Sequence, residues 1–131
     1  MNSQKTKGQI EDYISKEATK FYAKNLGIGP TSSKAYILHD MIILRFQGKL
    51  LPIEENLKDH HGGIKLIKDL RKALHETTAH EMNKMIHQIT HCKVLSSHSD
   101  LSTKTGEIIQ IYILDSDFEK ELKNSSGRLQ Q

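Results

Sequence analysis

The longest helical pattern in the chain runs from Ile64 to Ile89, where apolar residues recur every three or four positions. Neither glycine nor proline interrupts it, and at about 1.5 Å per residue it predicts a helix roughly 39 Å long. One side of this helix carries the residues expected to face the core, which are Ile67, Leu70, Leu74, Thr78, Met85 and Ile89. A helix of that length crosses a whole small domain, so we expect the other elements to pack against it.

Two further helices are predicted before this one. The first runs from Thr6 to Leu26, with Thr6 as its N-cap. Gly27 can take the left-handed conformation that ends many helices, and Pro30 prevents continuation. A short helix should begin at Pro52, because proline suits the first helical turn and two glutamates follow at its positive end.

Runs rich in β-branched residues predict two β-hairpins. The first joins residues 35–38 to residues 41–46 through the two-residue turn His39-Asp40, which sets a register that pairs Ile37 with Ile42 and Tyr36 with Ile43. The second joins residues 93–98 to residues 107–114 through a longer polar loop.

This element order predicts an α+β fold built from two successive α-β-β units. The strands should form a four-stranded, mostly antiparallel sheet, with the long helix and a second helix packed on one face. We expect one domain over residues 1–123, ending in a helical turn or two at 115–123, and a flexible C-terminal tail over residues 124–131.

Both faces of the first hairpin are apolar near its turn. The face opposite to the one that carries Ile37 and Ile42 contains Tyr36, Leu38, Met41 and Ile43. A sheet with one solvated face should alternate more cleanly between apolar and polar residues. We therefore expect a second copy of the chain to cover these four side chains in a homo-oligomer, with a dimer favoured.

Composition and charge narrow the class of protein. Over 131 residues, 36% are hydrophobic and 27% are charged, which is typical of a globular protein. The net charge of +3 is spread along the chain, which argues against nucleic-acid binding. No apolar run is long enough to span a bilayer, the N-terminus does not resemble a secretory signal, and the single Cys92 fits a reducing cytoplasm.

The densest polar cluster is the loop of the second hairpin. Its candidate ligand-binding residues are Asp100, Ser102, Thr103, Lys104, Thr105 and Gly106. Hydroxyls, backbone N–H groups and a lysine can together hold a small oxyanion such as phosphate or bicarbonate. Alternatively, the hydroxyls bond to the local backbone and the glycine supplies a positive φ.

Glu81 falls near the centre of the apolar side of the long helix. A buried carboxylate must meet a cation or lose its charge, and Arg45 of the first hairpin is the predicted partner. The alternative is a partly exposed break in the apolar side.

His87 and His91 are four residues apart, a spacing that brings two imidazoles together on a helix. A zinc site needs further ligands, which the neighbouring sequence does not supply in a recognisable pattern. We therefore predict no metal at these histidines. The sequence also has no recognisable Ser/His/Asp order, phosphate-binding loop or pair of catalytic carboxylates, so we predict no cofactor and no catalytic residues.

Several stretches taken together resemble the MpsC family of bacterial membrane-potential-generating systems. They are Lys7–Ile10, Leu26–Pro30, Tyr36–Met41 and Asp100–Glu107, and the resemblance runs from Lys7 to Leu114. It implies a cytoplasmic accessory or regulatory protein of a system that couples sodium movement to membrane potential or inorganic-carbon supply. Such a protein would be peripheral to the inner face of the membrane through a membrane-protein partner and would act by protein–protein contact.

The resemblance supplies no catalytic residues, because it implies no assigned chemistry. Its Asp-x-Ser-Thr-x-Thr-Gly loop corresponds to residues 100–106. Two other functions remain open beside the accessory role. One is a small-molecule or anion sensor that uses this loop, with Lys104 and Arg45, and the less favoured one is a nucleic-acid-binding module.

Overall fold

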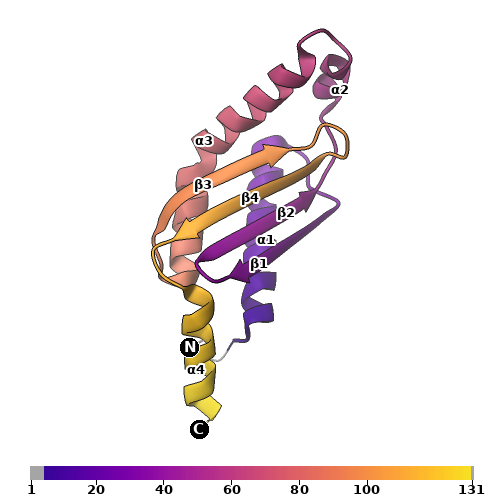
Figure 1. Cartoon of the computed structure of the whole chain (residues 1–131). Helices are drawn as coiled ribbons and strands as arrows, with labels where there is room; N and C mark the ends of the chain where they lie inside the picture. The colour runs from indigo at the N-terminus through magenta and orange to yellow at the C-terminus, as the bar shows by residue number, and fades with distance from the viewer. Residues whose placement is uncertain (1–4, 131) are drawn as a thin grey trace.

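The computed structural model describes residues 5–130, and side chains as far as Asn124. Two α-β-β units follow one another, and a last helix closes the chain (Figure 1). The elements are α1 (Lys7–Leu26), β1 (Ser32–Leu38), β2 (Met41–Gln47), α2 (Pro52–Lys58), α3 (Gly63–Thr90), β3 (Val94–Leu101), β4 (Glu107–Leu114) and α4 (Phe118–Gln130). The strands form one sheet in the order β1-β2-β4-β3, and every neighbouring pair is antiparallel. The predicted α+β fold is confirmed.

Both long helices lie on the same face of the sheet (Figure 1). α1 packs against β1 and α3 packs against β3, while the two helices also contact each other. The fully buried side chains between these layers are Ile14, Ile37, Ile42, Leu44, Phe46, Ile67, Ile86, Tyr112 and Leu114. The other face of the sheet has no described helix over it.

The local signals for α1 act as predicted. The Thr6 hydroxyl accepts a hydrogen bond from the backbone N–H of Gln9, and the Gln9 side chain accepts one from the backbone N–H of Thr6. This reciprocal capping box satisfies donors that the first helical turn leaves free. At the other end, Gly27 has φ +77° and its N–H donates to the carbonyl of Ala23.

The register of the first hairpin is also confirmed. Ile37 lies opposite Ile42 and Tyr36 lies opposite Ile43. His39 takes φ +54° in the two-residue turn, which allows the strands to reverse within so short a connection. β4 then pairs with β2 so that Ile43 lies opposite Ile111.

The buried side of α3 differs from the predicted one over its first half. Ile67, Met85 and Met82 are buried, but Leu70 is 51% exposed and the neighbouring Arg71 is buried instead. Four residues further on, His75 is also buried. The prediction placed Ile67, Leu70 and Leu74 on this part of the buried side and did not include Arg71, although a charge can be buried when the fold supplies a partner for it.

The C-terminal helix is longer than the sequence predicted. α4 reaches Gln130, so the predicted tail at 124–131 is helical in all its described residues, and Gln131 lies outside them. Phe118 is buried at the start of α4 and anchors the helix to the domain. No helix among residues 5–130 is long and apolar enough to cross a membrane.

Candidate functional site

One face of the sheet points away from α1 and α3 (Figure 1), and apolar side chains are gathered on it. We call it the outer face. Its apolar members are Tyr36, Leu38, Met41, Ile43, Ile109, Ile111 and Ile113, all at least partly exposed to solvent. They form rows across the strands, because Tyr36 lies opposite Ile43 and Ile43 lies opposite Ile111. The structure thus brings together the four residues predicted from the first hairpin.

Sequence reasoning missed the three isoleucines that β4 adds to the outer face. The signal was present, because residues 107–114 contain the adjacent apolar pair Ile108-Ile109 and the run Ile111-Tyr112-Ile113. Adjacent apolar residues on a strand point to opposite faces, so such a strand is apolar on both sides.

The outer face carries one ion pair at its edge. Arg45 Nη2 and Nε donate to Glu107 Oε2 at 2.6 and 3.1 Å, and the Gln47 side chain donates to the same oxygen at 2.6 Å. The hydrogen bond to Glu107 and its negative charge raise the pKa of Arg45. The charge of Arg45 is therefore matched within the chain, whereas the exposed Lys34, opposite Arg45 on the same face, forms no ion pair with another described residue.

The predicted pair between Glu81 and Arg45 does not form. Arg45 lies on the outer face and α3 covers the opposite face, so the sheet separates the two side chains. The Glu81 side chain is 52% exposed, and Lys24 Nζ lies 3.9 Å from its Oε2. The alternative interpretation, an exposed break in the apolar side of α3, is the one the structure shows.

A buried ion pair exists elsewhere, between Glu54 of α2 and Arg71 of α3. Sequence reasoning missed it, although Arg71 follows the buried Ile67 by one helical turn and so shares its side of the helix. Glu54 also accepts a hydrogen bond from the backbone N–H of Leu51 at 2.7 Å, which caps the first turn of α2.

In the loop between β3 and β4, hydroxyl groups bond to the nearby backbone. Ser102 Oγ accepts from the N–H of Thr105 at 3.3 Å, and Thr105 Oγ1 accepts from the N–H of Glu107 at 3.2 Å. Gly106 has φ +77° and supplies the left-handed residue of the turn. These contacts agree with the alternative interpretation, in which the loop chemistry serves the turn.

The remaining candidate residues of this loop, Asp100, Thr103 and Lys104, differ in their exposure to solvent. Thr103 is buried and Lys104 is exposed. Asp100 lies at the end of β3, where its Oδ1 is 3.2 Å from Lys68 Nζ of α3. Anion binding by the loop at residues 100–106 stays a prediction.

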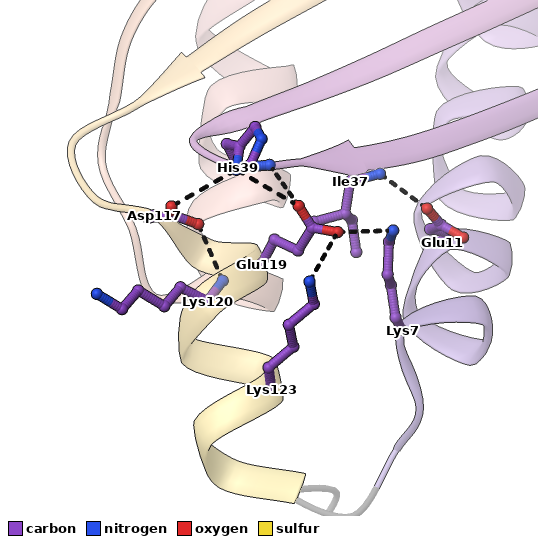
Figure 2. Close-up of polar contacts among 8 residues, drawn as sticks. All are labelled: Lys7, Glu11, Ile37, His39, Asp117, Glu119, Lys120 and Lys123. Atoms are coloured by element: carbon purple, nitrogen blue, oxygen red, sulfur yellow. Dashed lines mark hydrogen bonds and ion pairs between the residues drawn. The ribbon is translucent and has the colours of Figure 1, made fainter. Parts of the chain in front are cut away.

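The outer edge of β1 is closed by carboxylates, as Figure 2 shows. Glu11 of α1 accepts a hydrogen bond from the N–H of Ile37 at 2.8 Å, and Glu119 of α4 accepts one from the N–H of His39 at 2.9 Å. Lys7 Nζ lies 2.9 Å from the other oxygen of Glu119. An edge strand whose N–H groups already have partners is a poor template for adding another strand.

The two histidines considered as metal ligands end α3. His87 Nδ1 lies 2.9 Å from the carbonyl oxygen of Cys92, and His91 is the C-cap, with φ +61°. Within the part of the chain that the structure describes, no three His, Cys, Asp or Glu residues are grouped so that they could hold a metal ion.

Comparison with known proteins gives the family. The family model for the Na+-translocating membrane potential-generating system (MpsC) matches residues 6–116, most of the chain. The chain belongs to the MpsC family. This MpsC-family chain is also 40% identical over 119 residues to the uncharacterized protein YbcI of Bacillus subtilis (strain 168), an alignment that covers 91% of the chain and 96% of YbcI. No solved structure matches it.

Proposed function

We propose that this MpsC-family chain is a non-enzymatic, cytoplasmic accessory or regulatory protein of a Na+-translocating, membrane-potential-generating system, and that it acts by protein–protein contact. The family description supports the link to such a system. The outer face supports the mode of action, because a contiguous apolar surface of this kind on a single chain is typical of an interaction site.

The occupant of the outer face is a second copy of the chain. A two-fold symmetric interface places the same surface on both partners, so its charges must be compatible with themselves. Arg45 already has its counter-charge in Glu107, and the residues of β1, β2 and β4 that lie in line with Ile43 and with Met41 are uncharged. The row that contains Lys34 and Arg45 borders this uncharged area. Covering the face with its own copy therefore buries no unmatched charge at its centre.

The carboxylates beside β1 favour stacking of faces over pairing through this edge of the sheet, whose other edge is β3. Glu11 and Glu119 occupy the N–H groups of Ile37 and His39 that an added strand would need. In the dimer, the loops at residues 100–106 remain available on each subunit as a polar surface for a membrane-protein partner.

The dimer is tested by sedimentation velocity at micromolar concentration. Ile111→Lys places a charge at the centre of the outer face. The control is Ile28→Lys, which makes the same change between α1 and β1 at a side chain that is 49% exposed. We expect the unaltered chain and Ile28→Lys to be dimers and Ile111→Lys to be a folded monomer by circular dichroism. A strictly monomeric unaltered chain contradicts the dimer.

The accessory role is tested in cells that lack the gene. Sodium-dependent membrane potential, measured with a voltage-sensitive dye, should fall in these cells and return when the unaltered chain or Ile28→Lys is supplied. Ile111→Lys should not restore it. A potential that does not respond to loss of the gene contradicts the link to the sodium system.

A further inference from the structure

A cavity of about 60 Å³ lies on the covered side of the sheet, between α1, α3 and strands β2, β3 and β4. It is partly open to solvent. Most of its wall is apolar and consists of Ala18, Phe21, Leu26, Phe46, Leu74, Met82, Leu101 and Ile108. A buried water needs about 10–15 Å³, so the cavity has room for a small organic molecule or several waters.

Two residues of α3 that line this cavity each have a buried nitrogen atom without a hydrogen-bond partner among the described residues. These atoms are Nη1 of Arg71 and Nδ1 of His75, which lie one helical turn apart. The side chains are only 8% and 9% exposed. Native structures satisfy the great majority of their buried polar groups, so two unsatisfied nitrogens beside one cavity point to a missing partner.

The remaining nitrogens of both side chains are already engaged and hold them in place. Arg71 donates from Nε and Nη2 to Glu54, and Nε2 of His75 lies 3.1 Å from Ser97 Oγ. If Ser97 donates to Nε2, the neutral imidazole carries its proton on Nδ1. His75 then has one N–H left to offer, and Arg71 has both N–H groups of Nη1.

The chemistry of the site selects the ligand. The two available groups are donors, so the ligand must present an acceptor, and donors of this kind bind most strongly to an anionic oxygen. A phosphate dianion is a poor fit, because Glu54 already balances the charge of Arg71 and the wall is mainly apolar. An acceptor with a single negative charge brings less unmatched charge into the site than a dianion, and an apolar body fits the wall.

We propose that this cavity is a binding site for a small monocarboxylate, whose carboxylate accepts hydrogen bonds from Arg71 Nη1 and His75 Nδ1 and whose apolar tail contacts Phe21 and Leu74. The site lies across the sheet from the outer face. It is independent of the proposed dimer.

The test is an NMR titration of the ¹⁵N-labelled full chain with butyrate, butyramide and inorganic phosphate. We expect butyrate to give saturable shifts at residues around the cavity and at the ring nitrogens of His75. Butyrate should bind about tenfold or more tightly than butyramide, since hydrogen bonds to a charged group are stronger than those to a neutral one. Absence of saturable shifts, equal binding of butyramide, or tighter binding of phosphate overturns the proposal.

Variants of α3 locate the site without breaking the buried ion pair. His75→Leu removes the imidazole and leaves no side-chain donor, and His80→Leu makes the same change at an exposed position of the same helix. Leu74→Trp fills the cavity, and Leu70→Trp places the same ring on an exposed position that does not line it.

We expect His75→Leu and Leu74→Trp to weaken butyrate binding about tenfold or more and both controls to retain it. Where one of the two variants fails to fold, the other decides. Unchanged butyrate affinity in a folded His75→Leu or Leu74→Trp chain overturns the assignment.

Discussion

Arg71 and Glu54 meet through two parallel hydrogen bonds in the interior, from Nε to Oε2 at 2.7 Å and from Nη2 to Oε1 at 2.8 Å. Burial alone would raise the pKa of Glu54, but the hydrogen bonds from Arg71 and from the Leu51 N–H, together with the charge of Arg71, lower it. Likewise, burial opposes the charge of Arg71, while Glu54 raises its pKa. The pair fixes α2 against α3 and orients the guanidinium at the edge of the cavity.

Removing one member of this pair should destabilise the fold strongly. Arg71→Met leaves Glu54 buried without its cation, which typically costs about 3 to 5 kcal/mol. The free energy of unfolding from urea titration measures the loss. Lys72→Met is the matched control at an exposed neighbouring position, and it should stay within about 0.5 kcal/mol of the unaltered chain.

The double variant Arg71→Met/Glu54→Leu separates charge from packing. Replacing a buried ion pair with apolar residues of similar size is often close to neutral, so the double variant should regain most of the stability. If it is no more stable than Arg71→Met alone, the loss comes from packing and not from the unpaired carboxylate.

The corner between α2 and α3 requires glycine at position 63. A Cβ there would lie 1.6 Å from the carbonyl oxygen of Leu57, which is backbone and cannot move independently. Gly63→Ala should therefore lower the free energy of unfolding by about 1 to 3 kcal/mol or more.

Gly8→Ala is the control for this change, because Gly8 also lies in the first turn of a helix and its Cβ would have no neighbour closer than 4.0 Å. It should be neutral or stabilising by up to about 1 kcal/mol, since alanine favours helix over glycine. Equal effects of the two substitutions would contradict the steric explanation.

The contact between α4 and the first hairpin should make stability depend on pH. The backbone N–H of His39 and the ammonium of Lys7 hold the pKa of Glu119 at about 2, below its ordinary value of 4.5. Because the folded state binds this proton less readily than the unfolded state, the stabilisation is complete above about pH 4.5 and is lost as the pH falls towards 2.

Glu119→Gln should therefore unfold more easily than the unaltered chain at pH 7, and the difference should shrink below about pH 4.5. Urea titrations at several pH values measure it. Glu121→Gln, an exposed position of the same helix, should follow the unaltered chain at every pH. A difference for Glu119→Gln that stays constant from pH 7 to pH 2 would contradict the role of the ionised carboxylate.

The sequence determined the features that depend on near neighbours in the chain. The capping box at Thr6 and the left-handed Gly27 need only a few consecutive residues. A two-residue turn leaves little freedom of register, so His39-Asp40 fixed the pairing of Ile37 with Ile42. The apolar outer face followed from that register, because strand residues alternate between faces.

Tertiary structure alone decided which polar residues are buried. Glu81 follows the period of the apolar side of α3 and yet is half-exposed, while Glu54 and Arg71 are buried as charges. Periodicity identifies one side of a helix but not how deeply each turn of that side is covered. That depth depends on α2, α1 and β3, which are brought over α3 by contacts between residues far apart in the chain. The cavity beside His75 exists only because those elements meet there.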